Sequence, residues 1–184
     1  MKRFAAATVL LLLCLMAPTP AFARNGVKRY LTKETTVDMK GMNNICVGWV
    51  DLGADKWAAL GYDTKGEWSA VIDGLNAQFT ASLPALYLPG KTITGAKDKD
   101  DVSTTGCDLY VKFSDVYVDY DHYHLILAIH FVDPKTGTEI GTIPVRPYFG
   151  DEWGLRGYLN YALKEVATKM TVEITGAMPP KAKK

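Results

Sequence analysis

The sequence has no marked excess of charge of either sign. It holds 21 lysines and arginines against 20 aspartates and glutamates. Two of the basic residues, Lys2 and Arg3, lie in an N-terminal leader, so 19 basic and 20 acidic residues follow it. Proteins that bind nucleic acid need clustered positive charge to replace the counterions of the phosphates. We therefore expect no nucleic-acid partner.

Catalytic motifs are also missing from the sequence. It contains no G-x-S-x-G nucleophile elbow and no phosphate-binding glycine loop. Neither Cys46 nor Cys107 has a histidine beside it in the chain. We predict no catalytic residue and no cofactor, and the sequence favours a non-enzymatic binding or accessory protein over an enzyme.

Long apolar runs are absent except at the N-terminus, where Phe4–Met16 carries no charge and Ala21–Ala23 has the small-x-small pattern of a cleavage site. This predicts a cleaved signal peptide over residues 1–23 and a soluble, periplasmic or secreted product without a membrane anchor. A transmembrane helix would need about 20 apolar residues. The alternative is a lipoprotein modified at Cys14, but Leu13 is larger than the residue that lipidation requires there.

Two cysteines, Cys46 and Cys107, remain after the leader. An even pair in an oxidising compartment is a disulfide candidate. The alternative is a pair of buried free thiols, because free cysteine packs well in cores. The spacing leaves both interpretations open.

The rest of the chain divides into three segments. We predict a polar N-terminal segment over 24–44, a single domain over 45–176, and a disordered basic tail over 177–184.

Two amphipathic helices are predicted in the domain. The first follows a capping-box pattern at Thr64–Glu67 and ends or kinks at Pro84. The second runs over about 151–172, with its cap near Gly150 or Asp151 and its stop at Thr175–Gly176. Their apolar stripes consist of Trp68, Val71, Ile72, Leu75, Phe79 and Leu83, and of Leu155, Leu159, Ala162, Val166 and Met170.

Strands are predicted at Ile45–Val50 and Thr92–Thr94, with a further short strand near Tyr30–Leu31. A three-strand meander follows from Cys107 to Arg146, with a β-bulge at Ser114–Asp115 and a hairpin turn at Asp133–Gly137. Pro144 favours an edge position for the third of these strands.

These elements predict an α+β two-layer sandwich, a mostly antiparallel sheet of four or five strands with both helices on one face. The return strand of the meander then places four residues on the opposite face: His124, Ile126, Ala128 and Val132. We expect this face to be semi-apolar and to be left uncovered by the two helices. An envelope protein or a second copy of the chain would then cover it.

The candidate binding residues lie in the turn of the meander. They are Tyr120, His122, Tyr123 and His124. Two histidines two positions apart share a face of a strand and are able to bind zinc or copper. His130 lies about 20 Å further along the strand, and no glutamate follows the pair closely, so we predict no metal site. A ligand-binding protein, a metal-binding protein or a hydrolase that uses this hairpin is the alternative function.

The chain resembles bacterial exported envelope proteins of unknown function. The resemblance rests on the order strand, helix, strand, meander, helix and on the hairpin Phe131–Gly137. In element order these proteins are similar to the curli-secretion lipoprotein and the penicillin-binding-protein activator lipoproteins. The resemblance implies an accessory or assembly role in the cell envelope and transfers no functional residue. These families are commonly lipid-anchored. This chain departs from them, because Leu13 before Cys14 does not meet the requirement for lipidation.

Overall fold

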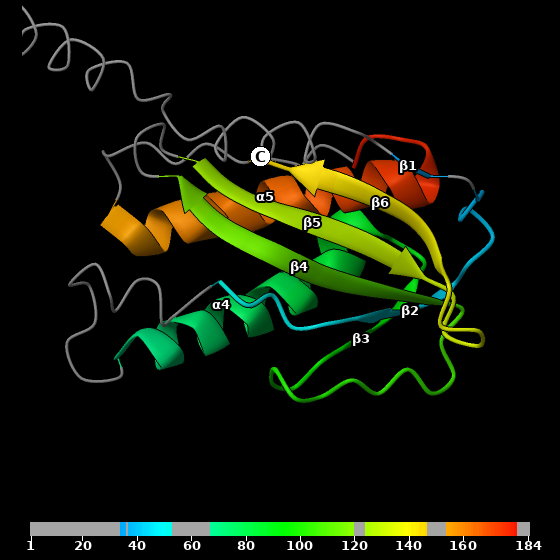
Figure 1. The fold of residues 1–184 in the computed structure, drawn as a ribbon, viewed down its shortest axis with the longest axis horizontal. Coiled ribbons are helices and arrows are strands. Elements are labelled where there is room, and N and C mark those ends of the chain that lie inside the picture. Colours follow the sequence, from blue (N-terminus) through cyan, green and yellow to red (C-terminus); the bar gives the residue numbers. More distant parts are fainter. Residues whose placement is uncertain (1–33, 36, 53–66, 120–123, 147–153, 180–184) are drawn as a thin grey trace, which may run out of the picture. The chain divides into compact units, whose positions relative to one another are not determined.

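The computed structural model describes residues 34–35, 37–52, 67–119, 124–146 and 154–179. Within them, one mixed sheet is accompanied by two long helices (Figure 1). The strands are β1 (Glu34–Thr35), β2 (Asn44–Val47), β3 (Thr92–Gly95), β4 (Leu109–Asp119), β5 (His124–Val132) and β6 (Glu139–Val145). The helices are α4 (Glu67–Ser82), the π-helical turn η2 (Leu83–Tyr87) that continues it, and α5 (Gly154–Thr175). The predicted signal peptide, the predicted strand near Tyr30–Leu31 and the residues from 180 onward lie outside the described residues.

The strand order in the sheet is β1-β6-β5-β4-β2-β3. β4, β5 and β6 form the predicted antiparallel meander, and β1 pairs antiparallel with β6. β2 lies parallel to both β3 and β4, so the chain crosses from β2 through α4 into β3, as parallel neighbours require. The predicted α+β class and the mostly antiparallel sheet are confirmed. The described sheet has six strands rather than four or five, because β1 adds a two-residue strand that the sequence pattern does not reveal.

The hydrophobic core lies between the sheet and the two helices, which cover the same face (Figure 1). The alternation predicted for the meander is confirmed. Its buried inward side chains are Leu109, Val111, Phe113, Leu127, Ile129 and Phe131. The helices contribute Ile72, Leu75, Phe79, Leu159, Ala162, Val166 and Met170, all buried. Neither helix has the length and apolar composition that a membrane span needs.

One polar side chain, Asn76, lies within the buried face of α4. It is 3% exposed. Its Oδ1 accepts the N–H of Val50 at 2.9 Å, and its Nδ2 donates to the carbonyls of Val50 at 3.0 Å and Ile72 at 3.1 Å. The chain after β2 is therefore hydrogen-bonded to α4. The strand ends at Val47, three residues before the end of the apolar run at Val50.

Both helices end where the sequence predicts. α4 ends at Ser82, and Pro84 lies at the start of η2. α5 extends to Thr175, and Gly176 then adopts a φ of 72°, with its N–H bonded to the carbonyl of Val172 at 2.9 Å. Glycine adopts this left-handed conformation without the steric cost that a Cβ brings. The predicted caps at Thr64 and Asp151 lie outside the described residues.

Cys46 and Cys107 form a disulfide. Their Cα atoms lie 5.8 Å apart, which is within the range that a disulfide bridges. The bond joins β2 to the residues just before β4, and both cysteines are buried. Of the two alternatives that the sequence left open, the structure has the bridge.

Two local predictions for the meander can be compared with the structure. The bulge is confirmed, because the register of β4 against β5 shifts between Ser114 and Tyr117. The edge position predicted for β6 is wrong, since β1 pairs with it. However, β1 pairs only with Gly141 and Thr142, so in the described sheet Pro144 lies beyond the reach of β1.

Candidate functional site

The candidate site lies on the outer face of the sheet, by which we mean the face opposite α4 and α5. Alternation along the strands points Lys112 and Ser114 of β4, His130 of β5 and Thr142 of β6 to this face. The pairing places Lys112 opposite His130 and His130 opposite Thr142. Three adjacent strands thus carry polar side chains in one row, which antiparallel pairing brings within contact distance.

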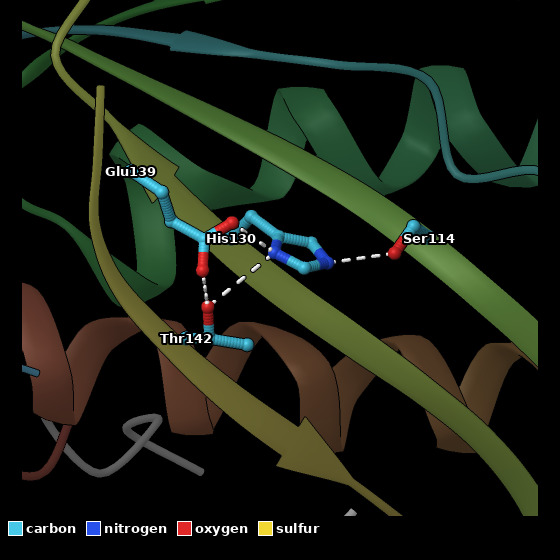
Figure 2. A network of polar contacts seen from close by, with 4 residues as sticks. All are labelled: Ser114, His130, Glu139 and Thr142. Atoms are coloured by element: carbon cyan, nitrogen blue, oxygen red, sulfur yellow. Dashed lines mark hydrogen bonds and ion pairs between the residues drawn. The ribbon is translucent and has the colours of Figure 1, made fainter. Parts of the chain in front are cut away.

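The polar side chains on the outer face form a continuous hydrogen-bonded network around His130 (Figure 2). Nε2 of His130 lies 2.6 Å from Oγ of Ser114, and Nδ1 lies 2.7 Å from Oε2 of Glu139. Thr142 donates its hydroxyl to Oε1 of Glu139 and also approaches Nδ1 of His130 at 3.4 Å. The His130 side chain is 19% exposed and that of Glu139 is 52% exposed.

The protonation state of Glu139 sets the direction of the hydrogen bonds. The hydroxyl of Thr142 first, and the contact with His130 after it, hold the pKa of Glu139 below its ordinary value. Glu139 is therefore an ionised acceptor at neutral pH. The tautomer that fits this contact carries its proton on Nδ1 of His130, which leaves Nε2 as the acceptor that faces the hydroxyl of Ser114.

An open hollow of about 440 Å³ lies beside the network. Its lining combines the polar residues of the network with Lys112 and with apolar or aromatic groups. The lining residues are Thr104, Tyr110, Lys112, Ser114, His130, Val132, Pro134, Gly137 and Glu139. The volume lies within the range of small-ligand sites. The hollow therefore offers a ligand both hydrogen-bonding groups and apolar contacts.

Lys112 and Tyr110 determine the electrostatics of the hollow. Lys112 is exposed, and its charge contributes to the lowered pKa of Glu139. Burial first, and the charge of Asp101 second, raise the pKa of Tyr110, so this phenol stays neutral at physiological pH. The hollow thus contains one cation, one carboxylate that is already hydrogen-bonded, and a neutral aromatic ring.

The sequence-predicted binding residues are not those of this network. Tyr120, His122 and Tyr123 lie outside the described residues. His124 is the first residue of β5 and pairs with Asp119, and the position of its side chain is not described. The prediction for this hairpin remains untested, and the network lies toward the opposite end of β5.

The prediction of an exposed semi-apolar outer face is wrong for two residues. Ile126 is 3% exposed and Ala128 is 5% exposed. Ala128 has a short side chain and lies between Ser114 and Pro144 of the adjacent strands. Val132, the third apolar residue of this set, is partly exposed and lines the hollow beside His130.

Sequence reasoning missed Ser114, Glu139 and Thr142, and it used His130 only to exclude a metal site. The sequence did contain a signal for this network. The alternation places His130 and Ser114 on the face opposite the core, and a polar side chain in the middle of a sheet needs a hydrogen-bonding partner. No group of three or more histidine, cysteine, aspartate or glutamate side chains in the described part of the chain is placed to hold a metal ion.

No protein-family model matches the chain, and no curated protein matches its sequence. Among the solved structures that overlap it loosely are two bacterial proteins. One is a dodecamer of a PelC point variant from Paraburkholderia phytofirmans, with 7% identity over 76% of this chain and 93% of that one, at a TM-score of 0.38. The other is a neuraminyllactose-binding hemagglutinin homolog from Helicobacter pylori, with 13% identity over 76% of this chain and 87% of that one, also at 0.38. Both overlaps are too loose to indicate a function.

Proposed function

We propose that the protein is an exported binding or assembly-accessory protein of the bacterial cell envelope and that the outer face is its binding surface. The observation that carries this proposal is the network around His130. It joins three strands on the face that the helices leave uncovered, and it borders a hollow of ligand size. A binding role requires no chemical step.

Export is supported by the Cys46–Cys107 disulfide, because structural disulfides persist in oxidising compartments and are rare in the cytosol. The apolar leader and the small-x-small pattern at Ala21–Ala23 agree with this. Intact-mass measurement of the protein from a periplasmic fraction tests it. We expect a chain that begins at Arg24 and is two hydrogens lighter than its reduced form. Retention of the leader in the cytosol would contradict export.

Binding is tested by cross-linking in the native envelope, followed by mass spectrometry of the products. We expect one predominant partner, which is another envelope protein. The variant Lys112→Glu reverses a charge on the outer face and should reduce the yield of this product. Its matched control, Lys169→Glu, reverses an exposed charge on α5 and should leave the yield unchanged. Cross-links only between copies would instead indicate self-association, and equal losses in both variants would contradict the assignment to the outer face.

A further inference from the structure

We propose that Ser114, His130 and Glu139 form an acyl-transfer centre, in which Ser114 accepts an acyl group from an ester bound in the hollow. This activity goes beyond the binding role proposed above and does not depend on it. The three side chains come from three adjacent strands and make contact in the order nucleophile, base, carboxylate. Unrelated folds use this order to activate a serine, so geometry rather than sequence position identifies it.

The first step of the argument is the direction of proton transfer. A serine hydroxyl is a weak nucleophile until a base within hydrogen-bonding distance removes its proton during attack. Nε2 of His130 lies 2.6 Å from Oγ of Ser114, and Glu139 keeps the ring proton on the other nitrogen. The free lone pair of the imidazole therefore points at the hydroxyl of Ser114.

The second step is the fixed position of the base. Both oxygens of Glu139 have partners, because Oε2 contacts His130 and Oε1 accepts from Thr142. The ring of His130 is only 19% exposed and lies between its two partners (Figure 2). Glu139 and Thr142 are thus positioning residues, which hold the tautomer and the orientation of the imidazole.

The third step concerns the negative charge that develops on the carbonyl oxygen of the ester. A lysine ammonium is one of the groups that stabilise such an oxyanion. Lys112 lies on the same face of β4 two residues before Ser114, and it pairs directly with His130. It lines the same hollow as Ser114. Lys112 therefore supplies the positive charge for the oxyanion.

The reaction balances without a further reagent. Oγ of Ser114 forms a bond to the ester carbonyl carbon while its proton moves to Nε2 of His130. The tetrahedral intermediate then collapses, the bond from carbon to the alcohol oxygen breaks, and Nε2 returns the proton to the departing alcohol. The products are an acyl ester on Ser114 and one free alcohol.

A fluorophosphonate probe tests the centre, since attack by an activated serine displaces fluoride and leaves a stable phosphonyl ester. In the full-length exported protein we expect one adduct, which tandem mass spectrometry places on Ser114. The variants Ser114→Ala and His130→Gln should lower the rate of labelling at least about 100-fold, in line with the loss of a nucleophile or a general base. The controls Ser103→Ala, at an exposed serine, and Lys169→Met should label at the wild-type rate.

Three further variants test the roles of Lys112 and Glu139. Lys112→Met should lower the rate of labelling about 100-fold. Glu139→Gln should lower it as well, because the imidazole of His130 loses the acceptor that holds its orientation. Glu139→Asp keeps a carboxylate at this position and should restore part of the rate. If Glu139 only stabilised the fold, the rate of labelling would follow the melting temperature of each variant rather than the presence of the carboxylate.

The proposal is overturned if Ser114 carries no adduct under conditions that label a reference serine hydrolase. It is equally overturned if Ser114→Ala labels as fast as the wild type. Placement of the adduct in the wild-type chain does not depend on the folding of any variant. Failure here leaves the binding role intact, because the cross-linking of envelope partners requires no nucleophile.

Discussion

Replacement of Asn76 by alanine is the sharpest test of how the chain after β2 is attached to α4. Asn76 satisfies both backbone groups of Val50, at 2.9 Å and 3.0 Å, and it is 3% exposed. In Asn76→Ala, both groups of Val50 become buried without a partner. The carbonyl of Ile72, which Asn76 also contacts, keeps the helical N–H at position 76.

The expected cost follows from these two groups. A buried backbone donor or acceptor that loses its partner costs about 1–3 kcal/mol. We therefore expect Asn76→Ala to lower the free energy of unfolding by about 2–6 kcal/mol. This is a large part of the roughly 5–15 kcal/mol typical of a domain. A loss of about 3 kcal/mol corresponds to a fall in melting temperature of about 6–12 °C.

Urea unfolding followed by circular dichroism measures the change, with the slope of the transition compared as a check on two-state behaviour. The matched control is Gln78→Ala, at an exposed position on α4, which should change stability by less than about 0.5 kcal/mol. A second variant, Asn76→Asp, places a carboxylate against two carbonyl oxygens. Burial raises the pKa of this carboxyl in the folded state, so its penalty relative to the wild type should be smaller at pH 4 than at pH 7. A loss below about 1 kcal/mol in Asn76→Ala would refute the reasoning.

Three further predictions concern other parts of the fold. Replacing Cys46 and Cys107 by alanine removes a cross-link between residues 61 apart in the chain. By loop entropy, this should lower the free energy of unfolding by about 4 kcal/mol. An unchanged denaturation midpoint would contradict this. Glu139 has a pKa below its ordinary value of 4.5, so it stabilises the fold above that pH and loses this effect as pH falls through the folded-state value. Glu139→Gln should flatten the acid side of the stability profile, and a profile as steep as that of the wild type would argue against it. Finally, a Cβ on Gly95 would collide with the side chain of Thr80, so Gly95→Ala should lower the free energy of unfolding by about 1–3 kcal/mol. Adding Thr80→Ala in a double variant should recover part of this loss. Strictly additive losses would show that the two residues do not interact.

The helices and the meander were predictable because local signals determine them. The three- and four-residue spacing of Ile72, Leu75 and Phe79 indicates a helix with one buried face, and the alternation at Leu109, Val111 and Phe113 indicates a strand. Proline at 84 and glycine at 176 mark helix ends for steric reasons that no tertiary contact needs to supply. These elements are confirmed.

The network around His130 was not predictable because it depends on strand register. Ser114, His130 and Glu139 are brought together only when β4, β5 and β6 pair at the observed positions, and the bulge after Ser114 alters the spacing along β4. The pairing of Asn76 with Val50 also joins residues from different elements. The sequence pattern directed attention instead to His122 and His124, which lie close together in the chain.

The claim that the outer face is the binding surface is tested most directly by a photo-reactive amino acid placed at one position on each face. Position 112 lies on the outer face, and position 169 is exposed on α5. Both proteins are exported into the envelope and irradiated there, and the products are identified by mass spectrometry. We predict a discrete cross-linked partner from position 112 and none from position 169. Products from position 169 alone would contradict the assignment of function to the outer face.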